Sequence, residues 1–159
     1  TPSWSPDGKQ LAFTVEHPRS RWSIHRANID GTNDIRVAGS SIDSGLPSWS
    51  PDGKRIAFER YMDTGGNSQV FIMDADGKNA TQLTKDPSWY CSHSDWVSDT
   101  ELVVACQSVS APCRAGASQG QPQTSCVRRL FSISTDPDSP QFRMLFDHDG
   151  ATPAVAPHE

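Results

Sequence analysis

The sequence has no excess of basic residues. Its 159 residues include 14 lysines and arginines against 19 aspartates and glutamates, giving a formal net charge of −5. Proteins that bind nucleic acid by neutralising phosphates need the opposite balance. No hydrophobic run approaches the roughly 18 residues of a membrane-spanning helix, and residues 1–8 are polar, unlike a targeting signal. We therefore expect neither a nucleic-acid partner nor membrane insertion.

The sequence also lacks a Cys-x-x-Cys pair, the usual element of a structural zinc site. Its cysteines instead form an even cluster between positions 91 and 126. Such a cluster is typical of disulfides in an oxidising compartment. We therefore expect a periplasmic or extracellular protein with no metal site and no cofactor.

What the chain does contain is an internal repeat. Residues 2–14 read PSWSPDGKQLAFT and residues 47–59 read PSWSPDGKRIAFE, with ten identities in thirteen positions. A weaker third copy begins at residue 94, and residues 152–159 resemble the start of a fourth. A residue that recurs with a repeat occupies the same structural position each time. We therefore expect the three repeated tryptophans, Trp4, Trp49 and Trp96, to lie in the core.

Each repeat reads as four short antiparallel strands. In the second copy we predict strands at residues 47–50, 55–60, 69–74 and 80–84, separated by turns that contain Pro, Asp and Gly. Residues 70–73 are all apolar, so both faces of this sheet must be covered. Four-stranded units that repeat about every 45 residues are typical of β-propeller blades. A β-sandwich, the alternative, does not require such a recurrence.

The predicted fold is therefore all-β, an arc of a six-bladed propeller. We place blade 1 at residues 2–39, blade 2 at 47–85, blade 3 at 94–147 with a cysteine-containing insertion at 107–127, and the first strand of blade 4 at 152–159. Three blades leave two sheet faces uncovered. Because the chain starts without Met and both ends fall at the same point of the repeat, we expect a segment of a longer propeller. A head-to-tail homodimer of six blades is the alternative.

The repeated motifs resemble those of a known protein family. Residues 49–58, which read WSPDGKRIAF, and residues 71–77, which read FIMDADG, resemble the PD40 (WD40-like) repeat of TolB-like propellers. The resemblance covers residues 2–146 and implies a radial, often six-bladed propeller in secreted or periplasmic proteins that bind partners. Similar propellers also occur in prolyl-oligopeptidase-like and tricorn-like peptidases, so the resemblance does not determine one activity.

The long connections all lie at one end of the predicted sheets. This loop end holds the connections from second to third strands and those between repeats, whereas short turns form the opposite turn end. Variable loops on a rigid scaffold are where binding usually resides. We predict that the loop end binds a protein or peptide through His17, Arg19, Arg21, Trp22, Tyr61, Asp63, Trp89, Tyr90 and His93. Local packing is the alternative for Trp22, which can begin a strand, and for Trp89 and Tyr90, which lie outside any predicted strand.

The same topology brings the four cysteines to the loop end. We expect disulfides between Cys91 and Cys106 and between Cys113 and Cys126, although four cysteines allow three pairings. A disulfide within the insertion would give a preformed contact surface. An insertion without a partner is the alternative.

Two further motifs do not support chemistry. Residues 116–120 match the Gly-x-Ser-x-Gly nucleophile motif but have no apolar strand before them and no helix after them. Residues 74–79 resemble the opening of a calcium loop, yet the downstream glutamate is missing, so a hairpin turn is predicted. We therefore predict no catalytic residues in this chain.

The sequence thus predicts a non-catalytic, protein- or peptide-binding propeller module that needs further blades or a second copy to close its ring. Two alternatives stay open. The blades could be the substrate-gating domain of a prolyl-oligopeptidase-like serine hydrolase whose catalytic domain lies outside this chain. They could also belong to a structural surface protein that pairs through open blade edges.

Overall fold

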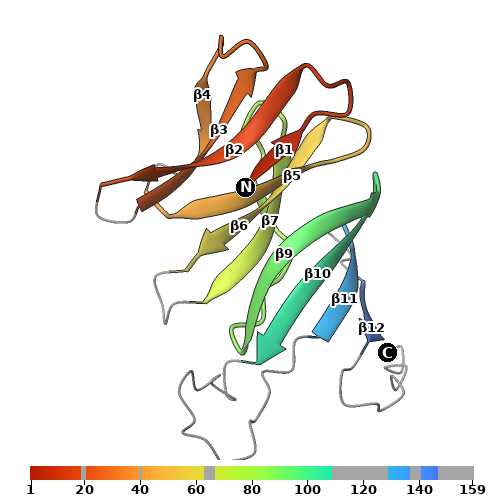
Figure 1. Ribbon diagram of the computed structural model, residues 1–159. Helices are drawn as coiled ribbons and strands as arrows, with labels where there is room; N and C mark the ends of the chain where they lie inside the picture. The colour runs from red at the N-terminus through yellow and green to blue at the C-terminus, as the bar shows by residue number, and fades with distance from the viewer. Residues whose placement is uncertain (19–20, 40, 63–66, 109–128, 137–140, 147–159) are drawn as a thin grey trace, which may run out of the picture.

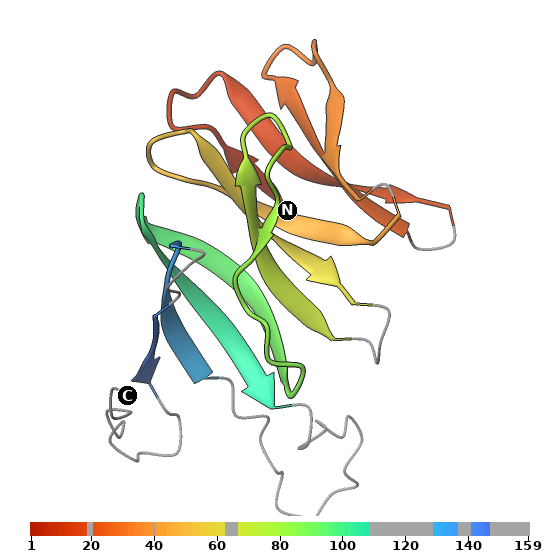
Figure 2. The ribbon, with the colours of Figure 1, turned by 180° about the vertical axis from the view of Figure 1, so that it is seen from behind.

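The computed structural model describes residues 1–18, 21–39, 41–62, 67–108, 129–136 and 141–146. These residues form twelve strands and no helix, arranged as three four-stranded antiparallel sheets (Figure 1). No helix that could span a membrane occurs in these ranges. Figure 2 shows the second sheet between the other two. The predicted all-β arc of propeller blades is confirmed, while residues 152–159 lie outside the described part of the chain.

Strand order follows the chain within every sheet. The first sheet contains β1 (Pro2–Trp4), β2 (Gln10–His17), β3 (Arg21–Asn28) and β4 (Ile35–Ala38). The second contains β5 (Ser44–Trp49), β6 (Arg55–Tyr61), β7 (Ser68–Asp74) and β8 (Thr81–Gln82). The third contains β9 (Trp89–Ser98), β10 (Glu101–Ser108), β11 (Arg129–Ser134) and β12 (Phe142–Phe146).

The repeated Ser-Pro-Asp-Gly turns have the same hydrogen bonds in both copies. The Ser5 hydroxyl donates to Asp7 Oδ1 at 2.7 Å, and the Ser50 hydroxyl donates to Asp52 Oδ1 at 2.6 Å. These bonds are the main cause of a lowered carboxyl pKa at Asp7 and at Asp52. Because Asp bonds the backbone and side chains of its own turn, the sequence specifies this geometry locally.

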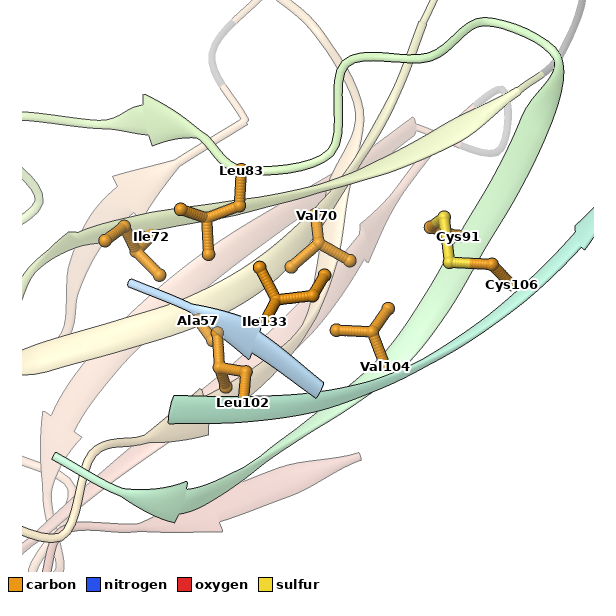
Figure 3. Close-up of a cluster of buried hydrophobic side chains, with 9 residues drawn as sticks. All are labelled: Ala57, Val70, Ile72, Leu83, Cys91, Leu102, Val104, Cys106 and Ile133. Atoms are coloured by element: carbon orange, nitrogen blue, oxygen red, sulfur yellow. A yellow bond between two sulfur atoms is a disulfide. The ribbon is translucent and has the colours of Figure 1, made fainter. Parts of the chain in front are cut away.

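Two apolar cores lie between neighbouring sheets. The first consists of Ala12, Ile24, Trp49, Ile56, Phe58, Phe71 and Met73. The second, drawn in Figure 3, consists of Ala57, Val70, Ile72, Leu83, Cys91, Leu102, Val104, Cys106 and Ile133. Residues 70–73 of β7 therefore alternate between the two cores, which explains why the whole run is apolar and buried.

The three repeated tryptophans do not share one environment. Trp49 is 7% exposed in the first core, and the half-buried Trp96 packs against the second, whereas Trp4 is 54% exposed. The prediction that all three lie in the core is therefore wrong for Trp4. Trp49 and Trp96 each pack on the preceding sheet, and the described part of the chain places no sheet beyond Trp4.

β9 begins earlier than the repeat predicts. Trp89 and Tyr90 lie within this strand, paired with Ser108 and Gln107 of β10, so their predicted position outside any strand was wrong. The strand starts early because β10 offers backbone partners along its whole length. Cys91 pairs directly with Cys106, and the two form a disulfide with a Cα–Cα distance of 4.1 Å. Cys113 and Cys126 lie outside the described residues.

Candidate functional site

Three aromatic side chains, one from each sheet, form what we call the aromatic row at the loop end: Trp22, Tyr61 and Tyr90. The Trp22 and Tyr61 rings meet edge to face, with centroids 5.2 Å apart. Tyr61 also shares a side-chain hydrogen bond with Tyr90. Burial, with a smaller effect of the neighbouring Tyr90 and of Glu59, raises the pKa of the Tyr61 phenol above its usual range. The Tyr61 phenol therefore stays uncharged at physiological pH.

Asp43 holds the row in place from the connection between the first two sheets. Its Oδ1 accepts the Trp22 backbone N–H and pairs with Arg21 Nε, both at 3.1 Å. Its carbonyl oxygen accepts the Tyr61 N–H at 2.9 Å. Arg21 also donates to the Ser41 carbonyl at 2.7 Å. Arg21 thus anchors this connection, and Asp43 is a site residue that the sequence analysis missed because nothing in its local sequence marks it.

The two predicted histidines make contacts within and between sheets. His17 Nε2 lies 2.7 Å from the hydroxyl of Ser23, whose residue is fully buried in the first sheet. The His93 backbone N–H donates to the buried Glu59 Oε1 at 2.6 Å, and His93 has a left-handed backbone with a φ of 54°. Of the remaining predicted residues, Arg19 and Asp63 lie outside the described part of the chain.

Trp89 lines an apolar pocket of about 370 Å³ between the second and third sheets, which we call the interblade pocket. Its Trp89 ring meets Phe131 edge to face at 5.6 Å, and the Arg129 guanidinium lies 5.5 Å from the Trp89 centroid. The full lining is Leu83, Thr84, Lys85, Asp86, Trp89, Cys91, Cys106, Phe131, Phe142 and Met144. Sequence reasoning found Trp89 but not Phe131 or Phe142, because strand pairing brings these distant residues together.

The pocket and the aromatic row offer contact area rather than reactive groups. Large aromatic side chains held in place by their neighbours are the usual anchors of binding surfaces. Phe142 is 48% exposed, so part of this apolar wall faces solvent. Among the described residues, no three His, Cys, Asp or Glu side chains are placed to hold a metal ion. Residues 116–120, which carry the Gly-x-Ser-x-Gly motif, lie outside these residues.

The sequence matches a known family over most of its length. The family model PD40, described as the TolB beta propeller domain, matches residues 1–146. The chain belongs to the PD40 family. The resemblance seen in the repeats is thereby confirmed, and no curated protein sequence matches this PD40 chain.

Solved structures share the fold of the PD40 chain at low identity. Putative TolB from Agrobacterium tumefaciens is 21% identical with a TM-score of 0.62, and the match covers 91% of this chain and 48% of that one. Oligogalacturonate lyase in complex with manganese is 17% identical with a TM-score of 0.63, covering 92% and 41%. Prolyl oligopeptidase B from Galerina marginata is 14% identical with a TM-score of 0.60, covering 91% and 20%. The PD40 chain thus spans half or less of each of these structures.

Proposed function

We propose that this PD40 chain is a non-catalytic module of an extracytoplasmic protein, and that it binds a protein or peptide at its loop end. The observation that carries the proposal is the interblade pocket, whose Trp89 and Phe131 rings form an apolar wall between the second and third sheets. Its volume of about 370 Å³ has room for one large apolar side chain. Burying such a side chain contributes roughly 1.5–3 kcal/mol. An extended peptide would place one apolar residue in the pocket and its neighbouring residues along the loop end.

The disulfide supports the assignment of this protein to an oxidising compartment. Cys91 and Cys106 are joined, and disulfides persist in oxidising environments. We therefore assign the protein to the periplasm or the extracellular space. The matched relatives are roughly twice as long or longer, so we propose that further blades, or a second copy of the chain, cover the exposed face around Trp4.

A second candidate is the gating domain of a prolyl-oligopeptidase-like serine hydrolase. The observation that favours it is the shared fold of Prolyl oligopeptidase B bound to a 35mer substrate, of which this chain covers 20%. In that setting the interblade pocket would select peptides before cleavage by another domain. The presence of a hydrolase domain in the intact protein would favour this second candidate function.

The experiment is peptide binding by the intact protein, measured as fluorescence anisotropy of labelled hexapeptides with Phe, Leu, Ser or Asp at one central position. We expect the Phe and Leu peptides to bind more tightly than the others. Trp89→Ala should lower the affinity for the Phe peptide about ten-fold or more, which is the usual effect of truncating an aromatic anchor. Ile29→Ala, an exposed apolar residue away from the pocket, should leave binding unchanged.

Phe142→Ser provides a second test, because this exposed residue can be replaced without opening the core. This substitution should also lower the affinity for the Phe peptide. Equal binding of all four peptides, or unchanged binding by both pocket variants, would refute the proposal.

A further inference from the structure

The two junctions between sheets differ at the turn end. At the second junction the Trp96 indole N–H donates to the Ser48 carbonyl at 3.0 Å. Arg55 covers the Trp96 ring, with its guanidinium 5.2 Å from the centroid, and donates to Thr135 Oγ1 at 3.1 Å. Arg55 and Trp96 thus fill the space between these sheets, and the Ser48 carbonyl satisfies the indole N–H.

The first junction lacks this arrangement. Gln10 occupies the repeat position of Arg55, and Trp49 occupies that of Trp96. Trp49 is 7% exposed, yet its indole N–H has no hydrogen-bond partner among the described residues. A buried donor without a partner is costly and rare in folded proteins. The missing acceptor therefore points to a group that the described residues do not supply.

Arg26 adds a second donor at the same place. In the strand register Arg26 pairs with Ala12, just as Ile72 pairs with Ala57 in the next repeat, so a charged residue occupies an apolar position. Its Nε is buried without a partner in the described structure, and its Nη1 reaches Gln10 Oε1 only at 3.5 Å. The replacement of an apolar residue by arginine brings positive charge to the junction.

Trp49 and Arg26 line a pocket of about 270 Å³, which we call the turn-end pocket. One water takes roughly 30 Å³ in the liquid, so the space exceeds that of a single bridging water. Asp7 and Asp52, from the two repeated turns, also line it. The lowered pKa of each carboxyl keeps both groups ionised at neutral pH. Asp7 uses only Oδ1 within its turn, which leaves its second oxygen to accept another donor.

We propose that the turn-end pocket binds a small zwitterion, an ammonium group and a carboxylate on one carbon as in a free α-amino acid. The carboxylate accepts hydrogen bonds from the Trp49 indole and the Arg26 guanidinium, while the ammonium group donates to Asp7 and Asp52. An anion alone would face two carboxylates, and a cation alone would leave both buried donors unpaired. The site lies at the opposite end of the sheets from the interblade pocket and does not depend on the proposed function.

Indole N–H signals of the intact, 15N-tryptophan-labelled protein test this site directly. Trp49→Phe identifies the relevant signal by removing it. We expect glycine to shift that signal saturably, whereas acetate and methylammonium at the same concentrations do not. The absence of a saturable shift with glycine, as expected if the pocket holds only water, would overturn the proposal. Equal binding of acetate or methylammonium alone would also overturn it.

Charge variants supply the control. Arg26→Gln should weaken glycine binding about ten-fold or more, since a charge-assisted hydrogen bond is lost. Arg36→Gln removes the same charge from an exposed position in β4 and should not affect binding. Arg26→Ile copies the next repeat, so it keeps the fold and abolishes binding. Unchanged glycine affinity in both Arg26 variants would contradict the site.

Discussion

The guanidinium of Arg55 lies over the indole of Trp96, 5.2 Å from its centroid, and joins the second sheet to the third. The same arginine donates hydrogen bonds to Thr135 Oγ1 and to the Asp99 carbonyl. One side chain of β6 therefore contacts three parts of the next blade. This junction is open to direct test.

Arg55→Ala should destabilise the protein by about 1–3 kcal/mol, because it removes a cation–π contact and two hydrogen bonds. Urea unfolding of the intact protein measures the loss. Arg36→Ala, at an exposed position of β4, is the matched control and should change stability by less than about 0.5 kcal/mol. Similar losses in both variants would show that the Arg55 contacts contribute little.

Glu59 should be among the most sensitive positions in the chain. It is fully buried, and its carboxylate accepts the His93 N–H at 2.6 Å and the Ser68 hydroxyl at 3.1 Å. Glu59→Ala leaves both donors without this acceptor, so we expect the free energy of unfolding to fall by about 2–4 kcal/mol. Glu59→Gln keeps one acceptor oxygen and should cost less. Thermal unfolding compares the two, and an alanine variant as stable as the glutamine variant would contradict this role.

The Cys91–Cys106 disulfide should stabilise the third blade. The two cysteines are 15 residues apart, and closing a loop of this length contributes about 3 kcal/mol in the unfolded chain. Replacing both with alanine should therefore lower the urea midpoint. Reductant should lower the midpoint of the parent protein at least as much, because it also reduces the predicted Cys113–Cys126 disulfide. If the double variant unfolds at the same midpoint as the parent, the disulfide has no stabilising effect.

Gly77 and Gly53 form a matched pair for testing how closely the first two blades approach. Both have a left-handed backbone, with φ of 87° and 69°. A Cβ on Gly77 would lie 2.7 Å from the Val37 carbonyl oxygen in β4, whereas a Cβ on Gly53 would meet nothing closer than Pro6 Cδ at 3.5 Å. Gly53→Ala should cost about 1 kcal/mol through backbone strain alone.

Gly77→Ala adds the steric clash to that strain and should cost at least about 2 kcal/mol. Chemical denaturation of the two variants gives the difference. Equal losses would mean that the turn at Gly77 moves away from Val37 without cost.

The parts of this structure that could be predicted are those set by nearby residues. Ser50 and Asp52 close their turn with a bond between residues two apart, and Ser5 and Asp7 repeat it. Likewise, an apolar run at residues 70–73 requires a cover on both faces, whatever supplies it. Local sequence therefore predicted the repeat, the sheets and the family.

The candidate site was only partly predictable. Loop position suggested Trp22, Tyr61 and Tyr90, and the structure brings these three together. Asp43 was missed, because its importance comes from contacts with Trp22 and Tyr61 in two different sheets. Residue type and spacing along the chain do not specify which side chains from different sheets meet.

Trp4 and Trp49 show the difference between what the local sequence determines and what the tertiary structure decides. Both stand in the sequence PSWSPDGK, and this sequence determined a strand followed by the same turn in each copy. Only the tertiary structure decided that Trp49 is 7% exposed and Trp4 is 54% exposed. The physical reason is that burial depends on which sheet packs over a side chain, and that sheet is built from residues elsewhere in the sequence.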